Sequence, residues 1–242
     1  MKPDNSTLPL LEQGLAKLNI TGGENTLSLL SRYIEEIELF NPAYGLVKVQ
    51  DRRELIVKHI FDSLAPIDIL RRLFNGVAHN DRTANAGKAP AIADAGSGAG
   101  LPGIPLAVCM GGAEFTLIER MGRRAGFLRN TLAILGLGNV SIEETEMEKL
   151  ASSPSGRGRF DIIVFRAFRP LEPAILKALF ALLAPGGSLA AYKGRRESIE
   201  EEMTQACVAA EKGAGPKIGG WEVFPLEVPF LEEERHLLLV KP

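Results

Sequence analysis

Three glycines at alternate positions are the first sign of chemistry in this sequence. A short apolar segment ends at Asp94, and Gly96, Gly98 and Gly100 follow it. Glycine allows positive φ and the close approach of another molecule to the backbone, so this segment predicts a loop that binds a ligand through its amides. A tight connection without a ligand is the alternative.

The spacing of the glycines excludes two common phosphate-binding motifs. A dinucleotide fingerprint would need glycine at position 101, where Leu101 stands. A Walker loop would continue into Gly-Lys-Ser/Thr, and no lysine follows here.

The elements around the loop must place its ligand at the edge of a sheet. Pro102 and Pro105 favour a helix start directly after the loop. A strand, a glycine turn and a helix in this order bind ligands at the carboxyl end of a parallel sheet. The next apolar run ends at Glu119, whose carboxylate can accept hydrogen bonds from the hydroxyls of a ribose, although a plain surface charge is the alternative. Asp94 either orients the loop or contacts the ligand.

Strands and helices are expected to alternate in the second part of the chain. The apolar runs expected to be strands are 91–96, 114–119, 139–144, 160–167, 188–194, 221–229 and 235–242. Most of the earlier runs are separated by helix-like segments, which predicts an α/β fold with a mainly parallel sheet. The last two runs are close in sequence and predict an antiparallel hairpin, and Pro225 and Pro229 favour the sheet edge for the first of them.

The first part of the chain is expected to be helical. Apolar residues recur at three- and four-residue steps over Glu24–Phe40, and Pro42 is expected to end that helix. A second helix is expected over Arg53–Ala65. We therefore divide the chain into N-terminal helices (1–73), a flexible loop (74–90) and an α/β core (91–242) that form one unit.

Composition limits the class of protein. The chain has 242 residues, enough for a sizeable core, and a formal charge of −2, which taken alone argues mildly against a nucleic-acid partner. Cys109 and Cys207 are too few for a disulfide framework. The chain lacks a secretory signal at its start and a run of roughly 18 apolar residues, so a cytoplasmic protein with no membrane partner is expected.

The glycine segment resembles the nucleotide-binding loop of class I S-adenosylmethionine-dependent methyltransferases. The extension Leu101–Pro105 makes the resemblance more specific, to the bacterial small-subunit (16S) ribosomal RNA guanine-N7 methyltransferases of the RsmG/GidB type. Further matching segments, in order, are 59–64, 123–129, 166–167, 193–194 and 234–237. The chain departs from the family pattern at Gly45 and Val47, where the family has Asn and Thr, which puts hydrogen bonding in that turn in doubt.

The resemblance implies a Rossmann-like fold with a mostly parallel seven-stranded sheet and S-adenosylmethionine as the co-substrate, without a metal. The residues expected to bind it are Asp94, Gly96, Gly98, Gly100, Leu101, Glu119, Met147, Glu148 and Arg166. Arg166 is also the expected catalytic residue, because it follows a buried strand at the edge where substrates bind, and an ordinary ion-paired arginine is the alternative. The implied partner is 16S rRNA or the small ribosomal subunit, and a monomer is expected.

Methylation at guanine N7 needs no base, because N7 carries a lone pair and no proton. His59, Asp62 and Ser63 imitate a hydrolase set, but neighbouring positions on one helix rarely give that geometry. We expect His59 and Asp62 to pin the N-terminal helices to the ligand edge, with a packing histidine as the alternative.

Arginines and lysines near strand ends predict a basic rim for RNA. The expected RNA-binding residues are Arg123, Arg124, Arg129, Lys193 and Arg195. Acidic residues are expected to gather elsewhere, at 143–148 and 197–202. Solvated helix faces with paired charges are the alternative for each basic cluster.

The sequence is also compatible with two other functions. A small-molecule methyltransferase would show a closed apolar pocket and no continuous basic rim. A non-enzymatic RNA-binding or redox-linked regulator would bind no cofactor despite its glycines.

Overall fold

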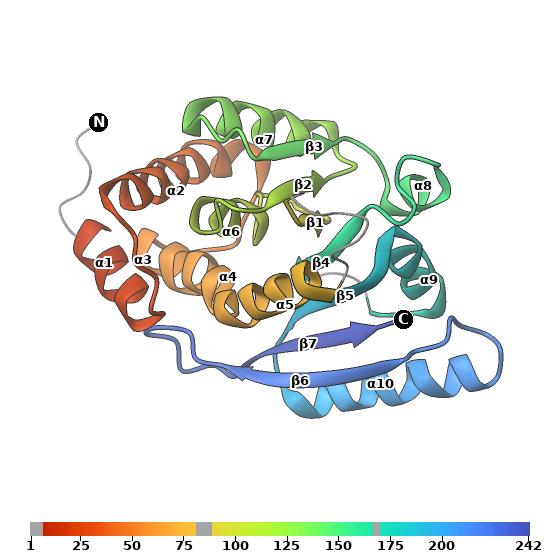
Figure 1. Ribbon diagram of the computed structural model, residues 1–242. Helices are drawn as coiled ribbons and strands as arrows, with labels where there is room; N and C mark the ends of the chain where they lie inside the picture. Colours follow the sequence, from red (N-terminus) through yellow and green to blue (C-terminus); the bar gives the residue numbers. More distant parts are fainter. Residues whose placement is uncertain (1–6, 81–88, 167–169) are drawn as a thin grey trace.

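The core of the protein is a seven-stranded, mostly parallel sheet (Figure 1). The computed structural model describes residues 7–80 (side chains to 73), 89–166 and 170–242. The strands are β1 (Ala91–Ala95), β2 (Glu114–Ile118), β3 (Val140–Glu143), β4 (Phe160–Arg166), β5 (Leu183–Lys193), β6 (Gly220–Leu226) and β7 (Arg235–Lys241). Their order is β3-β2-β1-β4-β5-β7-β6. This confirms the predicted fold class.

The pairing also confirms the predicted hairpin. The first five strands run parallel, whereas β7 runs antiparallel to both β5 and β6. β6 lies at the sheet edge, as Pro225 predicted, because proline has no amide to donate to a second neighbour.

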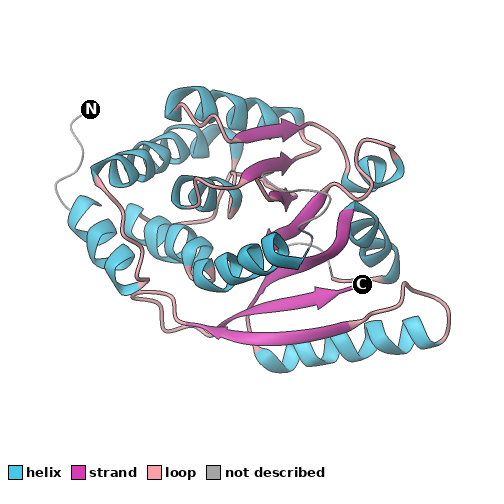
Figure 2. Cartoon of the chain, in the orientation of Figure 1, coloured by secondary structure: helices cyan, strands magenta, loops and turns pink. Residues whose placement is uncertain are grey.

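Helices cover both faces of the sheet (Figure 2). They are α1 (Thr7–Lys17), α2 (Glu24–Tyr44), α3 (Arg52–Leu55), the π-helix η1 (Ile56–Phe61), α4 (Asp62–Leu64), α5 (Ile67–Asn80), α6 (Gly103–Cys109), α7 (Gly122–Leu135), α8 (Met147–Ser152), α9 (Pro173–Leu182) and α10 (Arg196–Glu211). Within the described ranges, none of them is long and apolar enough to cross a membrane.

Successive strand residues enter two separate cores. Ile162 and Val164 of β4 pack with α1, α2, α6 and α7, whereas Ile163 and Phe165 pack with α8, α9 and α10. Side chains alternate between the faces of a strand, so a strand covered on both faces is apolar throughout. The N-terminal helices share the first core, which leaves no separate core of their own.

The helix α2 extends further than the sequence predicted. The predicted end at Pro42 is wrong, since the helix continues to Tyr44 and ends at Gly45, whose φ is 58°. The Gly45 amide donates to the Asn41 carbonyl, and the Asn41 side chain accepts from the Val47 amide at 2.9 Å. These bonds close the helix end and restore a hydrogen bond that the departures at Gly45 and Val47 had put in doubt.

The predicted loop 74–90 begins too early. Helix α5 continues to Asn80, so residues 75–80 are helical, and 81–88 lie outside the described residues. The small and polar residues of this segment have low helix propensity, so the sequence did not predict that the preceding amphipathic helix continues into it.

Candidate active site

The glycine loop, which we define as residues 94–103, connects β1 to α6. Gly96, Gly98 and Gly100 have φ values of 74°, 57° and 91°, a region that other residues rarely adopt. The amides of Gly96 and Ser97 both donate to the Ile118 carbonyl of β2, at 2.9 and 3.1 Å. The loop is therefore fastened to the neighbouring strand.

Two of these glycines meet very different surroundings. A Cβ at Gly100 would lie 2.5 Å from the Cδ1 atom of Ile104, so a side chain there would force the buried Ile104 to move. Among the described residues, a Cβ at Gly98 would have no heavy atom nearer than 3.9 Å, apart from atoms of its chain neighbours. The loop therefore leaves room for a ligand beside Gly98.

Asp94 lies beneath the loop and is completely buried. Its Oδ2 atom accepts from the Gly103 amide at 2.9 Å, whereas Oδ1 has no hydrogen-bond partner among the described residues. Burial raises the pKa of this carboxyl to about 7. A buried acceptor without a partner costs free energy, and a ligand amino group would relieve that cost.

Glu119 lies directly after β2, at its carboxyl end. Its two oxygens accept from the amides of Gly98 and Met121, at 2.9 and 2.8 Å. Each carboxylate oxygen has a second lone pair, so both can still accept from the two hydroxyls of a ribose. The free acceptor of Asp94, the space at Gly98 and this carboxylate together fit S-adenosylmethionine.

A pocket of about 380 Å³ opens beyond the ends of β2 and β3. It is lined by Arg120, Met121, Glu144, Thr145, Glu146 and Lys149. Two further predicted cofactor residues, Met147 and Glu148, begin the adjacent helix α8. The Met147 side chain is buried in the core beside α9, and Leu101 is buried in the other core.

The side chain of Arg166 is held by the N-terminal helices. At the end of β4, its Nη1 atom donates to the Lys58 carbonyl at 3.1 Å and to Asp62 Oδ2 at 2.9 Å. Its Nη2 atom lies 2.8 Å from His59 Nδ1. These contacts confirm that His59 and Asp62 pin the N-terminal helices to the sheet, at the carboxyl end of β4.

Asp62 joins Arg166 to a second arginine. Arg235, at the start of β7, lies 3.2 Å from Asp62 Oδ1 through its Nε atom. The Asp62 side chain is only 6% exposed, against 14% for Arg166 and 27% for Arg235. We call His59, Asp62, Arg166 and Arg235 the Asp62 cluster.

The imidazole of His59 is an acceptor in this cluster. Burial and the charge of Arg166 lower the pKa of His59 to about 4, so the ring is neutral and its Nδ1 atom accepts from Arg166. The hydroxyl of Ser63 donates to the backbone carbonyl of His59 at 2.6 Å, not to the ring. The apparent hydrolase set is therefore not a nucleophile with its base.

The π-helix η1 helps to form the Asp62 cluster. At its end the amide of Asp62 donates to the His59 carbonyl, while the Lys58 carbonyl accepts from Arg166. A π-turn shifts the backbone hydrogen bonds, and such turns often occur at functional sites. Sequence periodicity over Arg53–Ala65 predicted helix here and missed this turn.

Sequence reasoning also missed three residues that connect these parts. Arg235 belongs to a matched segment of the resemblance but received no role. The hydroxyl of Tyr33 donates to the Ala99 carbonyl at 2.7 Å, and that of Tyr192 to the Ser63 carbonyl at 2.8 Å. A tyrosine on an apolar helix face was the available signal for Tyr33, because a buried phenol needs a partner.

Two of the predicted RNA-binding residues form ion pairs with glutamates. Arg129 pairs with Glu144 at 2.5 Å, and Lys193 pairs with Glu202 at 2.7 Å. The expectation that acids gather elsewhere is therefore wrong. The parallel pairing of β2 with β3 places Glu144, just after β3, within reach of Arg129 on α7, and Glu202 lies on α10, which follows Lys193 and β5 in the chain. The guanidinium of Arg123 lies over the Tyr44 ring and donates to the Ala43 carbonyl.

The two other predicted RNA-binding arginines differ in surroundings. The Nη1 atom of Arg124 would lie 4.0 Å from a Cβ at Gly98, so this side chain reaches the glycine loop. Arg195 is exposed immediately before α10 and pairs with no carboxylate in the part of the chain that the structure describes.

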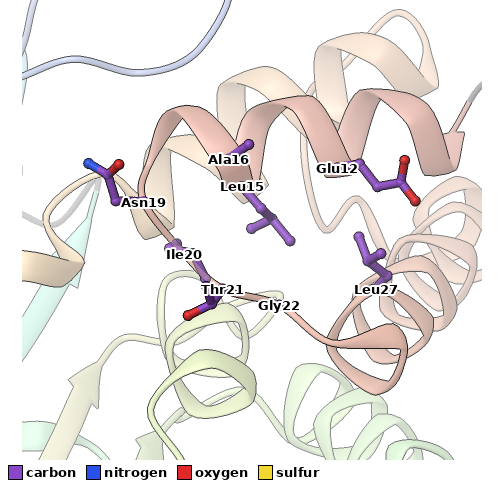
Figure 3. A pocket seen from close by; sticks show the side chains of 8 residues that line it. All are labelled: Glu12, Leu15, Ala16, Asn19, Ile20, Thr21, Gly22 and Leu27. Carbon is purple, nitrogen blue, oxygen red and sulfur yellow. The ribbon is translucent and has the colours of Figure 1, made fainter.

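A separate hollow of about 530 Å³ lies among the N-terminal helices and contains no predicted site residue. Its lining comprises Glu12, Leu15, Ala16, Asn19, Ile20, Thr21, Gly22 and Leu27. Figure 3 shows Leu15 and Leu27 pointing into it from α1 and α2. The structure gives this hollow no chemistry comparable with that of the glycine loop.

Comparison with solved structures agrees with the fold. A putative O-methyltransferase from Klebsiella pneumoniae matches with a TM-score of 0.56 and 18% identity, covering 96% of both chains. An S-adenosylmethionine-dependent methyltransferase from Aquifex aeolicus matches with a TM-score of 0.51 and 17% identity, covering 86% of this chain and 97% of that one. At these identities, only the fold is shown.

Comparison of sequences is more specific. The ribosomal RNA small subunit methyltransferase G of Treponema denticola is 38% identical, over 96% of this chain and 93% of the relative. The protein of the same description from Cellvibrio japonicus is 33% identical, over 96% and 94%. A family model described as rRNA small subunit methyltransferase G matches residues 26–218. The chain therefore belongs to the rRNA small subunit methyltransferase G family.

Proposed function

We propose that this protein transfers the methyl group of S-adenosylmethionine to N7 of a guanine in 16S rRNA. The observation that carries the proposal is that two features lie together at the carboxyl ends of the central strands. The glycine loop follows β1, and the Asp62 cluster surrounds the end of β4, which is the strand paired with β1. One feature suits the co-substrate and the other suits a polyanionic substrate.

The glycine loop and its carboxylates form the binding site for the co-substrate. When bound, S-adenosylmethionine supplies an electrophilic methyl group on a sulfonium. We assign the methionine side to Asp94, whose buried Oδ1 atom has no hydrogen-bond partner among the described residues, and the ribose to Glu119. We assign the adenine to the region of Met147 and Glu148, next to the pocket beyond β3.

The substrate side has to orient guanine rather than remove a proton. N7 has its lone pair exposed, so the rate enhancement comes from proximity and alignment with the methyl group. Arg166 is the candidate for this orientation, because its fork can meet guanine O6 or a phosphate. The Asp62 carboxylate offsets the charge of Arg166 and Arg235, which helps the site to tolerate a cationic product base.

The proposal extends to the N-terminal helices, the RNA surface and the setting in which the protein acts. Residues 1–73 complete the site as one unit with the core. Arg195, Arg123 and Arg124 form the candidate RNA surface, to which Arg129 and Lys193 contribute less because each is ion-paired, with Glu144 and Glu202. We expect a monomer that acts in the cytoplasm on rRNA or on the small subunit.

A labelling experiment tests the proposal. The protein is incubated with methyl-labelled S-adenosylmethionine and either isolated 16S rRNA or small subunits from a strain lacking this modification. Chain cleavage specific for N7-methylguanine then locates the label, and a single labelled guanine is expected.

Other outcomes would contradict it. Label at another atom of the RNA would refute the N7 assignment. Label confined to small metabolites would favour a small-molecule methyltransferase, and failure to bind the co-substrate would favour the non-enzymatic regulator.

A further inference from the structure

Tyr33 is a buried contact between the N-terminal helices and the glycine loop. It lies on α2 with no exposed surface, and its hydroxyl donates to the Ala99 carbonyl at 2.7 Å. Ala99 stands between Gly98 and Gly100, in the part of the loop where the backbone has positive φ. The contact therefore reaches the centre of the loop from 66 residues away.

This hydrogen bond completes the restraint of one peptide unit. The Gly100 amide, on the other end of the Ala99–Gly100 peptide, donates to the Ser97 carbonyl at 2.7 Å. Both polar atoms of that peptide are thus held, one by the loop itself and one by Tyr33. Glycines allow a peptide to rotate at little cost, and rotation would change the course of the backbone beside Gly98, where the loop leaves room for a ligand.

The two sides of the loop are held by different elements. The amides of Gly96 and Ser97 are fastened to β2, and the Gly98 amide to Glu119 just beyond it. The Ala99 carbonyl is fastened to α2 instead. Burial raises the pKa of Tyr33 well above its ordinary value, so the phenol stays protonated and remains a donor throughout the physiological range.

We propose that Tyr33 is a positioning residue for the co-substrate. By holding the Ala99 carbonyl, it presets the glycine loop and makes the N-terminal helices a working part of the S-adenosylmethionine site. This inference rests on the proposed function only in that the loop binds this molecule. Removal of the hydroxyl would then make ligand binding bear the cost of ordering the loop.

A second buried tyrosine provides the matched control. Tyr192 of β5 donates to the Ser63 carbonyl of α4 at 2.8 Å, across the same junction between sheet and N-terminal helices. Tyr33→Phe and Tyr192→Phe each remove one hydroxyl that donates to a backbone carbonyl. Only the first of these carbonyls belongs to the glycine loop.

The test measures binding of S-adenosylhomocysteine by calorimetry and unfolding by circular dichroism. Both variants should lose a similar amount of thermal stability. Tyr33→Phe should weaken S-adenosylhomocysteine binding about five- to tenfold, in line with one lost hydrogen bond, and Tyr192→Phe less than twofold. The KM for S-adenosylmethionine should rise in parallel in Tyr33→Phe, while the KM for rRNA stays unchanged.

Hydrogen exchange of residues 96–101 adds a direct measurement of the loop. Faster exchange in Tyr33→Phe alone is expected, at a temperature where both variants are folded. Equal affinities in all three proteins, equal losses in both variants, or a Tyr33→Phe chain that does not fold while Tyr192→Phe does would each overturn the inference. Absence of binding by the unaltered protein would instead refute the proposed function.

Discussion

The glycine loop and the Asp62 cluster face the same sheet edge but are built in opposite ways. In the glycine loop, Asp94 accepts a hydrogen bond from a residue nine positions away, and Gly98 donates one to a residue 21 positions away. In the Asp62 cluster, the partners of Arg166 are 104 to 108 residues away. The comparison shows that the co-substrate half of the site is largely a local structure, whereas the substrate half exists only in the assembled fold.

The largest expected effect tests whether the glycine loop carries co-substrate binding. Gly96→Asp places a side chain at φ 74°, which costs about 1–2 kcal/mol in the backbone, and adds a charge beside the buried Asp94. We expect S-adenosylhomocysteine binding to fall by at least about 100-fold in calorimetry.

Gly136→Asp is the control for backbone strain alone. Gly136 caps the end of α7 with φ 66°, and a Cβ there would meet no heavy atom of the described residues within 4 Å outside its neighbours and its own helix. This variant should lose stability but keep its affinity. A loss of affinity in both variants would remove the special role of the loop.

The next effect tests whether the Asp62 cluster belongs to the substrate half. Arg166→Ala removes a fork that donates to His59 and Asp62 and leaves the Asp62 carboxylate with Arg235 alone. We expect turnover on rRNA to fall about 100-fold through misplacement of the substrate, with S-adenosylhomocysteine affinity reduced less than threefold.

Arg159→Ala is the matched control at the other end of β4. Arg159 precedes the strand and pairs with Glu143 at 2.6 Å, so its loss should leave turnover unchanged. Affinity and turnover falling together in Arg166→Ala would place Arg166 in the co-substrate half. Unchanged turnover would remove it from the site.

A third prediction uses the carboxyl beneath the glycine loop. The pKa of Asp94 is about 7 in the folded protein and 3.8 in its ordinary state, so between these values the folded chain holds a proton that the unfolded chain has lost. The stabilisation from this proton is full below pH 3.8 and is lost as the pH rises through about 7.

Asp94→Asn should therefore change the pH dependence of unfolding. From pH 5 to pH 7, its unfolding free energy should fall less steeply than that of the unaltered protein, by up to about 1.4 kcal/mol per pH unit. Urea denaturation of both proteins without ligand measures this difference. Parallel curves would show that Asp94 does not retain its proton, and hence that burial beneath the loop does not raise its pKa.

The smallest effects are expected at the basic rim. Arg195 is exposed without a carboxylate partner in the described residues, whereas Arg129, which is exposed too, pairs with Glu144. Arg195→Ala should weaken rRNA binding about threefold and lower its salt dependence by about one unit of slope, and Arg129→Ala should change neither measurably. Filter binding at several salt concentrations measures both, and equal effects would show that ion pairing does not set which arginines bind RNA.

Local patterns were sufficient for the strands and the glycine loop. A buried strand such as Phe160–Arg166 is recognisable because both of its faces are covered, and the turn after Asp94 because three glycines occupy positions that need positive φ. The end of α2 was not predictable in this way. The helix continues through Pro42, whose fixed φ is compatible with a helix, and ends at Gly45, where Gly45 and Asn41 supply the closing hydrogen bonds.

The distribution of charge likewise divides into what the sequence predicts and what only the fold decides. The sequence separates basic clusters from acidic ones, and the net charge of −2 conceals both. In the structure, the parallel pairing of β2 with β3 brings Glu144 to Arg129 of α7, and Glu202 of α10 pairs with Lys193 at the end of the preceding strand β5. Only the spatial arrangement distinguishes a compensated arginine from one that is available to RNA.

The sequence by itself determined the fold class, the position of the co-substrate loop and the resemblance that identifies the family. Each depends on residues close together in the chain, since periodicity and glycine spacing act on the local backbone. Tertiary structure alone decided that Asp62 joins Arg166 to Arg235 and that Tyr33 holds the Ala99 carbonyl. These contacts join buried polar groups from distant segments, and such groups find their partners only when the hydrophobic cores on either side of the sheet have packed.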